Sequence, residues 1–219
     1  MRANKITMNK KSDLQASEQS GEKMMPEGEV MVRIGLYLLQ CPSAVPTVTI
    51  SLDRHHVVSG GKLIFDVMDF LRGEGWNKTN GTGPNPWNGE YTKHGFKLVV
   101  SSLSRGGDVI ATIGRKRVRV ECKKGPLGRK KGNPENKLVN EAIGQLVSIE
   151  EVDAENDVLL VAVPNTAPHH RKTELKDRPL MKRCGIAVVL VGRDGTVVGM
   201  PDLREASQLP RHPLPGDPR

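Results

Sequence analysis

Apolar residues follow two patterns along the chain that are typical of β-strands. In some segments they alternate with polar residues, which indicates a strand with one buried face, and in others they run together, which indicates a strand buried on both faces. The segment at residues 186–200 holds two valine-rich stretches around an Asp-Gly pair and predicts a β-hairpin. The segments of these kinds are residues 48–52, 96–102, 108–113, 116–122, 157–164 and 186–200.

Other segments place their apolar residues at the spacing of a helix. Residues 62–73 carry such a stripe and run into a glycine-rich stretch, which predicts a helix that stops there. Asn133, as an N-cap, starts a second helix that ends near residue 149. A polar and basic stretch before residue 186 predicts a third helix. Residues 30–38 also alternate, and their pattern leaves strand and helix open.

The order of these elements is helix, three strands, helix, strand, helix and two strands. It predicts an α/β fold with a central mixed β-sheet flanked by helices. We assign residues 28–200 to one domain, preceded by a disordered polar tail at residues 1–27 and followed by a proline-rich tail at residues 201–219. The loop at residues 77–95 is long for a compact domain, and such loops are often functional.

Composition excludes several classes of protein. Hydrophobic residues make up 37% of the 219 residues and aromatic residues 3%, so the core must be built from Val, Ile and Leu. No apolar run approaches the roughly 20 residues of a membrane helix, and the polar N-terminus lacks the apolar segment of a secretory signal. The 3 cysteines form neither a disulfide framework nor a zinc-binding pair. We therefore expect a cytoplasmic protein with no membrane partner.

The positive charge of the chain is concentrated in one short segment. Residues 115–131 contain nine Lys and Arg residues and one acid, Glu121, so their net charge of +8 equals that of the whole chain. A concentrated positive field attracts polyanions, and we interpret the segment as a contact for nucleic acid, with a solvated basic face as the alternative. The residues expected to bind nucleic acid are Lys124, Arg129, Lys130, Lys131, Arg171 and Lys172.

Two carboxylates and an amine are expected to meet in the same part of the chain. Asp108 opens one strand, and Glu121 and Lys123 lie two residues apart at the end of the next, so both project from one face while Cys122 points the other way. If the strands pair around Gly114, Asp108 lies beside Glu121. Oxygen ligands without histidine or thiolate favour Mg²⁺ or Mn²⁺, and the ammonium beside them suits hydrolysis of a phosphodiester. An exposed ion pair is the alternative for Glu121 and Lys123.

An aspartate at the start of one strand, followed by Glu-Cys-Lys at the end of the next and then by a helix, resembles the PD-(D/E)xK nuclease superfamily. Its members share the restriction-endonuclease-like fold, and the resemblance covers roughly residues 59–191. It implies that Asp108 and Glu121 bind the metal. The backbone carbonyl of Cys122 is implied as a further ligand, and Lys123 is implied as the catalytic lysine.

The resemblance also implies two residues outside this motif. Many members carry an acid in the first helix, and Asp66, nine residues before Gly75, is the candidate for that metal-binding position. Some members carry a glutamine in the helix after the lysine, which corresponds to Gln145 as a further catalytic residue.

Two other motifs in the sequence are candidates for a phosphate site or a metal site. Residues 59–62, Ser-Gly-Gly-Lys, lack the spacing of a phosphate-binding P-loop, and we interpret them as a glycine-rich helix start. The pairs at residues 55–56 and 169–170 are both His-His, but neither has the spacing of a zinc motif, and we expect them on the surface.

The sequence therefore predicts a metal-dependent nuclease that hydrolyses phosphodiester bonds of DNA, with Mg²⁺ or Mn²⁺ as its cofactor and double-stranded DNA as its partner. A nucleic-acid-binding module of the same fold without catalysis is the alternative. A protein that recruits partners through its tails is a third hypothesis. The choice between DNA and RNA, the specificity of cleavage and the formation of a homodimer stay open.

Overall fold

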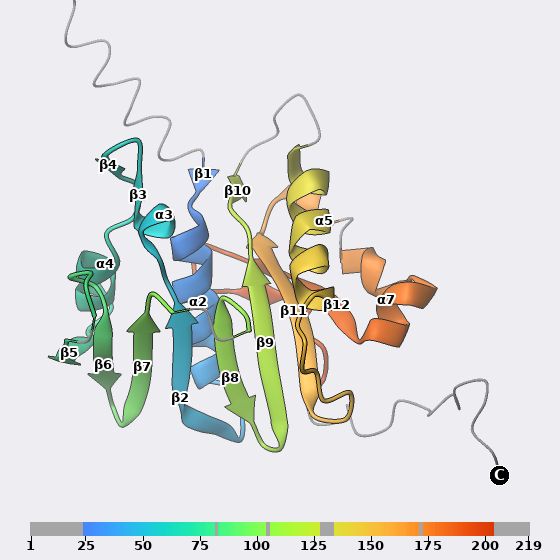
Figure 1. Cartoon of the computed structure of the whole chain (residues 1–219), viewed down its shortest axis with the longest axis horizontal. Helices are drawn as coiled ribbons and strands as arrows, with labels where there is room; N and C mark the ends of the chain where they lie inside the picture. The colour runs from blue at the N-terminus through green and yellow to red at the C-terminus, as the bar shows by residue number, and fades with distance from the viewer. Residues whose placement is uncertain (1–23, 82, 104–105, 128–133, 171–172, 204–219) are drawn as a thin grey trace, which may run out of the picture.

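The computed structural model of the chain describes residues 24–81, 83–103, 106–127, 134–170 and 173–203 (Figure 1). The strands are β1 (Met24–Met25), β2 (Ala44–Ser51), β3 (Val58–Ser59), β4 (Lys62–Leu63), β5 (Asn77–Asn80), β6 (Gly89–Lys93), β7 (Phe96–Ser101), β8 (Val109–Ile113), β9 (Lys116–Cys122), β10 (Gly125–Pro126), β11 (Asp157–Pro164), β12 (Ile186–Val191) and β13 (Val197–Val198). Nine of them form one sheet in the order β13-β12-β11-β9-β8-β2-β7-β6-β5, while β1 pairs with β10 and β3 with β4. The large sheet is mixed, which confirms the predicted α/β class.

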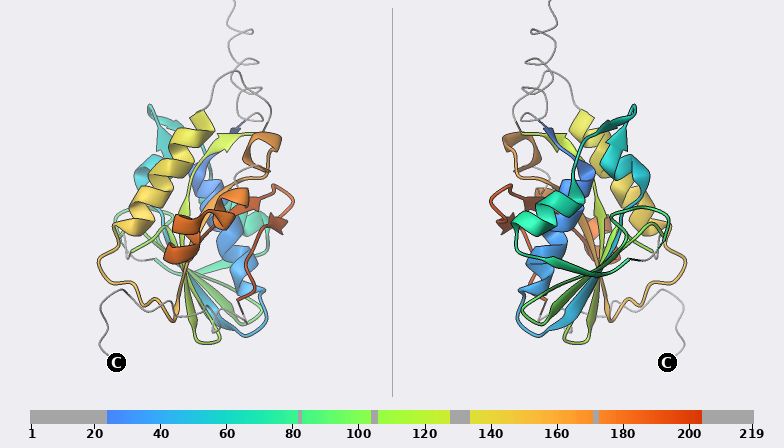
Figure 2. Two further views of the ribbon diagram at one scale, coloured as in Figure 1. Left: turned by 90° about the vertical axis from the view of Figure 1, so that its right-hand side faces the viewer. Right: turned by 90° about the vertical axis from the view of Figure 1, so that its left-hand side faces the viewer.

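Helices cover both faces of this sheet. Figure 2 shows α2 and α4 on one face and α5 and α7 on the other. Within the described parts of the chain, no helix has both the length and the apolar character that crossing a membrane requires. The helices are α2 (Glu27–Leu39), α3 (Arg54–Val57), α4 (Val67–Gly73), α5 (Pro134–Val147), α6 (Ala167–His170), the 3-10 helix η1 (Thr173–Asp177) and α7 (Pro179–Cys184).

The apolar strand β11 divides its side chains between the two helical layers. Leu160 and Ala162 belong to the core that includes α2, whereas Leu159 and Val161 pack with the buried side of α5. All four are buried, as the continuous apolar stretch predicts for a strand covered on both faces. The core therefore consists of two apolar layers separated by the sheet.

Six elements form the centre of the molecule: the helices α2 and α5 and the strands β2, β8, β9 and β11. Strand β2 is antiparallel to β8, β8 is antiparallel to β9, and β9 is parallel to β11. Helix α2 precedes β2 in the chain, and α5 connects β9 to β11. Residues 52–108 are inserted between β2 and β8 and add α3, α4 and the strands from β3 to β7. Two of these added strands, β5 and β6, lie in the segment 77–95, which we expected to be a loop.

The first long helix is α2, within the region whose pattern left strand and helix open. Pro26 is its N-cap residue, and Glu27 and Glu29 lie in its first turn, where acids are favoured by the helix dipole. Neighbouring residues such as Met31 and Val32 are both fully buried, because the helix is enclosed on most of its sides. A helix enclosed in this way shows no clear polar face, so its apolar pattern does not distinguish it from a strand.

The boundaries of the folded body differ from the prediction at the N-terminus. Residues 24–27 were assigned to a disordered tail, but Met24 and Met25 pair with Pro126 and Gly125, and Met25 is fully buried. The rest of that predicted tail and residues 204–219 of the C-terminal one lie outside the described residues.

Candidate functional site

The start of β8 and the end of β9 bring Asp108 and Glu121 together, as the sequence predicted. Pairing of Val109 with Val120 around the turn places these two acids side by side. The backbone of Asp108 is fixed on both sides, since its N–H donates to the Val120 carbonyl at 2.9 Å and its carbonyl accepts from Ser51 at 2.7 Å. Its carboxylate accepts a hydrogen bond of 2.7 Å from the Cys122 N–H. The carboxylate is therefore held at a defined place beside β9.

Lys123 lies in the same cluster, between acids from two helices. Its Nζ is 3.6 Å from Oε1 of Glu27, at the start of α2, and 3.6 Å from Oε1 of Glu141, on α5. The lysine is buried, with 4% of its surface exposed. The short β1–β10 pairing ties the chain before α2 to the chain after β9 and so brings Glu27 to Lys123.

His56 extends the cluster into the inserted segment. Its Nε2 lies 3.4 Å from Oε1 of Glu27, while its Nδ1 accepts a hydrogen bond of 3.2 Å from the Asp53 N–H. Asp53 is the N-cap of α3, and together with His56 it forms a capping box. The ring is thus oriented from one side by the α3 backbone and faces Glu27 with the other nitrogen.

The two strand acids carry an electrostatic cost in the absence of a cation. Burial and the neighbouring charge of Asp108 raise the pKa of Glu121 to about 8, although Lys123 opposes the shift. Burial also raises the pKa of Asp108, despite the hydrogen bond from Cys122. Such shifts are typical of carboxylates brought together out of water, and they cluster at functional sites.

The flanking groups stay charged. Burial alone would raise the pKa of Glu27, but the hydrogen bond from His56 and the charge of Lys123 lower it overall. Burial would lower the pKa of Lys123, but the surrounding acids, Glu27 and Asp108 foremost, raise it. The site therefore holds an ammonium beside two neighbouring acids, one of which, Glu121, keeps a proton near neutral pH when no cation is bound because its pKa is raised to about 8.

Asp108 and Glu121 are chemically suited to a hard divalent cation. A cation between them would remove their repulsion and the burial cost of their charges. The N–H and C=O of a residue in an extended strand point to the same edge, so the carbonyl of Cys122 faces the same side as its N–H, which meets Asp108. Within the described residues, no group of three or more His, Cys, Asp or Glu side chains is arranged to hold a metal. The donor set is therefore two carboxylates and a carbonyl.

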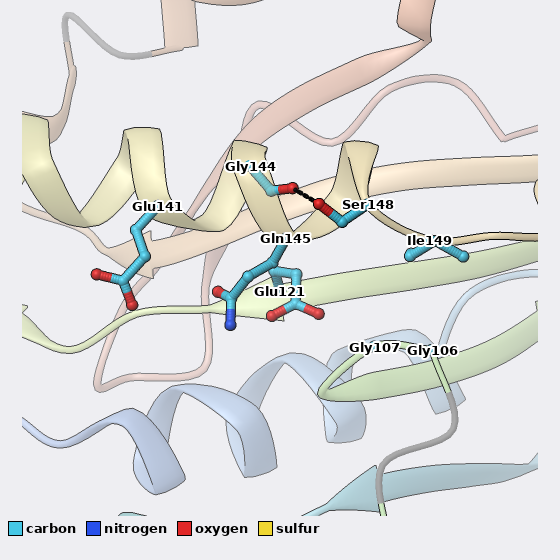
Figure 3. A pocket seen from close by; sticks show the side chains of 8 residues that line it. All are labelled: Gly106, Gly107, Glu121, Glu141, Gly144, Gln145, Ser148 and Ile149. Carbon is cyan, nitrogen blue, oxygen red and sulfur yellow. Dashed lines mark hydrogen bonds between the residues drawn. The ribbon is translucent and has the colours of Figure 1, made fainter.

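A pocket of about 560 Å³ opens beside this cluster, between α5 and the chain before β8. Glu121 lines it together with Glu141 and Gln145 of α5, which are one helical turn apart. Figure 3 shows the side chains of Glu141 and Gln145 leaving α5 on the side of β9, with Gln145 next to Glu121. Gln145 is exposed to the pocket, so the structure brings this predicted residue to the site.

Asp66 is not brought to this cluster. The helix predicted over residues 62–73 begins only at Val67, and Asp66 is its exposed N-cap, whose carboxylate accepts a hydrogen bond of 2.9 Å from the Asp69 N–H. An aspartate at this position satisfies the free N–H groups of a helix start, which explains its presence. The acid at the start of a helix that the structure brings to this cluster is Glu27, which lies 3.6 Å from Lys123.

The basic residues of the segment 115–131 have different surroundings in the structure. Lys116, Arg117 and Arg119 lie at the start of β9 and are engaged there: the Lys116 ammonium contacts the Glu155 carbonyl, and both arginines pair with Asp157. Lys123 is buried among the acids, while Lys124 is exposed next to it. The other residues predicted to bind nucleic acid, which are Arg129, Lys130, Lys131, Arg171 and Lys172, lie outside the described residues.

Sequence reasoning missed three members of the cluster: Glu27, His56 and Glu141. Glu27 was assigned to the tail, although a proline before it and a second acid two residues later are signals of a helix start. Glu141 lies four residues before Gln145 and therefore on the same helical face. His56 was expected on the surface, and no sequence signal connects it with α2.

Comparison of the chain with protein-family models, with curated proteins and with solved structures found no match. The geometry of the site is therefore what bears on its function. That geometry consists of two strand carboxylates, a buried lysine between two helix acids and an open pocket beside them.

Proposed function

We propose that this protein is a metal-dependent nuclease with the restriction-endonuclease-like fold, which hydrolyses phosphodiester bonds of DNA. The observation that carries the proposal is the convergence of Asp108 and Glu121, held side by side against their repulsion, with the buried Lys123 in the same cluster. Ionising both acids in this buried place is costly, and a cation between them would offset that cost.

The arrangement of the central elements supports this fold. Helix α2, the strands β2, β8 and β9, helix α5 and strand β11 follow the predicted order of helix, three strands, helix and strand, but α2 and β2 take the places for which the sequence predicted residues 62–73 and 96–102. The residues between β2 and β8 then count as an insertion. With this assignment the acid of the first helix is Glu27, which replaces Asp66 in the proposed site.

Each group has a defined task in this proposal. Asp108, Glu121 and the carbonyl of Cys122 would hold Mg²⁺ or Mn²⁺, which supplies Lewis-acid activation of the scissile phosphate and of a water molecule. Lys123 stabilises negative charge that develops on the phosphate, because the acids on either side keep it an ammonium. Glu27 positions Lys123, and Gln145 lies where it can orient a group that enters the pocket.

Cleavage of plasmid DNA tests the proposal. Purified protein is incubated with supercoiled plasmid and with a linear duplex in Mg²⁺, Mn²⁺ or EDTA. We expect nicking that requires the metal and that falls at least about 100-fold in Asp108→Asn and Lys123→Ala, while duplex binding is retained. Lys182→Ala, which removes an exposed lysine on α7, is the matched control and should cleave as the wild type does.

The alternative is a binding module of the same fold without catalysis. It has one observation in its favour, the absence of a three-residue metal group among the described residues. Salt-sensitive binding without cleavage in any metal would support this alternative and contradict the proposed nuclease.

A further inference from the structure

The Ser-Gly-Gly-Lys motif at residues 59–62 forms a hairpin turn and not the predicted helix start. Gly60 and Gly61 connect β3 to β4 with φ values of +56° and +76°. Both central residues of a type I′ turn have positive φ, which glycine adopts without strain. A side chain at either glycine would meet no atom within 4 Å, so the tip of the hairpin stands free of the body.

This hairpin exposes apolar side chains that the core does not use. Leu63 is 58% exposed and Ile64 41% exposed, whereas Val57 and Phe65, on either side of the hairpin, are buried. Two paired strands alone are only marginally stable in water, and the exposed pair adds nothing to the core. Adjacent exposed apolar residues on a projecting element are typical of a surface that contacts a partner.

The base of the hairpin packs against the first turn of α2, next to the candidate site. A Cβ atom at Gly28, in the first turn of α2, would lie 2.8 Å from the His56 carbonyl and 3.2 Å from the Phe65 ring. Both ends of the hairpin segment therefore touch α2 directly after Glu27, and His56 itself lies 3.4 Å from Glu27. In Figure 1 the hairpin rises from the end of the sheet at which β9 ends and α5 begins.

Two cations of this segment are available to a polyanion, whereas its acids Asp53 and Asp66 are engaged as the N-caps of α3 and α4. Arg54 on α3 and Lys62 on β4 are exposed, and no ion pair with another described residue is formed by either. Arg54 and Lys62 lie in the same segment as Leu63 and Ile64, so the surface combines positive charge with exposed apolar side chains. Proteins that bind the minor groove of DNA commonly combine cationic residues with an apolar wedge of this kind.

We infer that the β3–β4 hairpin is a DNA-binding arm that enters the minor groove beside the scissile phosphate. Leu63 and Ile64 pack against sugars and partly unstacked bases, while Lys62 and Arg54 contact the phosphates that flank the groove. The inference rests on the proposed function, because the hairpin can reach the DNA only where the DNA is bound at the candidate site next to Glu27. It identifies the substrate as a duplex that is distorted at the site.

Binding to a duplex that contains 2-aminopurine near its centre tests the inference. The full chain is used with Ca²⁺ in place of Mg²⁺, and both affinity and 2-aminopurine fluorescence are measured. The wild type should raise the fluorescence as bases unstack, while the Leu63→Ser/Ile64→Ser double variant should bind at least about 10-fold more weakly and leave the fluorescence low. Leu180→Ser removes a side chain that is 70% exposed on α7 and should change neither quantity.

Parallel measurements separate the inference from the proposed function. Urea unfolding should give the same midpoint for the double variant and the wild type, which excludes misfolding. Unchanged binding and fluorescence in the double variant would overturn the inference, even where metal-dependent cleavage by the wild type upholds the nuclease. Fluorescence that never rises with the wild type would also overturn it. Loss of binding and fluorescence in the double variant would uphold the arm, even where no metal supports cleavage.

Discussion

The two ends of strand β9 carry the same kinds of charged residue in opposite arrangements. At its start, the Asp157 side chain is fully buried and meets two arginines, with Arg117 donating to it at 2.7 Å and Arg119 lying 3.3 Å away. At its end, Glu121 is buried beside a second acid, Asp108. At the start of β9, cations from the chain pair with the buried carboxylate. At its end, two acidic side chains lie side by side.

The pKa values of the acids follow this contrast. Burial opposes ionisation of Asp157, but the hydrogen bond from Arg117 and the charge of Arg119 lower its pKa below the usual range. Burial and the charge of Asp108 raise the pKa of Glu121. Paired charges of the first kind fix a structure, whereas two neighbouring acids with raised pKa values, as at the second end, are the arrangement from which we propose a cation site. Lys116, Arg117 and Arg119 of the basic segment therefore make contacts within the folded chain.

Removal of the paired acid should have the largest effect on stability. Asp157→Asn leaves the buried Arg119 without its counter-ion, and we expect the free energy of unfolding to fall by about 3 kcal/mol. Urea unfolding measures this loss. Arg117→Gln is the comparison, since Arg117 is 44% exposed and its removal should cost less than about 1 kcal/mol. Equal losses in the two variants would contradict the assignment of Asp157 as a buried structural anchor.

The pH dependence of stability should distinguish the two ends. In EDTA, the folded protein holds a proton on Glu121 that the unfolded chain releases, so stability should fall as the pH rises from about 4.5 to about 8. Asp157 acts in the opposite direction: the stability it contributes is lost in acid, as the pH falls through its lowered folded pKa. Urea unfolding of wild type and Glu121→Gln at pH 5.5 and 8 measures the difference.

We expect Glu121→Gln to remove much of the decline between these two pH values, because its amide does not ionise. Asp157→Asn should leave that decline in place and alter only the acid range. A decline of the same size in Glu121→Gln and in the wild type would show that other groups determine it.

Much of the central sheet was predictable because each strand is buried on one face or on both, which gives an alternating or a continuous apolar pattern. Strand β9 was predicted with its observed bounds, and the glycine turn at Gly114 fixed the pairing that sets Asp108 beside Glu121. Helix α5 was predicted from its start signals and from one apolar stripe, since only one side of it is buried. Gln145 was a candidate because the family resemblance implies a glutamine in this helix, and α5 places it on the pocket beside Glu121.

The rest of the site depends on contacts between segments far apart in the chain. Glu27 reaches Lys123 through the β1–β10 pairing, which joins residues about a hundred positions apart and leaves no pattern in either segment. Asp66 was a candidate because the family resemblance implies an acid in the first helix. The apolar spacing that placed Asp66 inside that helix includes Leu63 and Ile64, yet both belong to the exposed hairpin. Periodicity registers apolar residues without distinguishing a core contact from a binding surface.

Mn²⁺ binding tests most directly the claim that the end of β9 is a metal site. Free Mn²⁺ is followed by electron paramagnetic resonance as the wild type, Asp108→Asn and Arg117→Gln are titrated at the same pH. We expect the wild type and Arg117→Gln to bind the ion alike, and Asp108→Asn to bind it at least about 10-fold more weakly, since one carboxylate ligand is lost. Equal Mn²⁺ affinity in Asp108→Asn and the wild type would contradict the metal site.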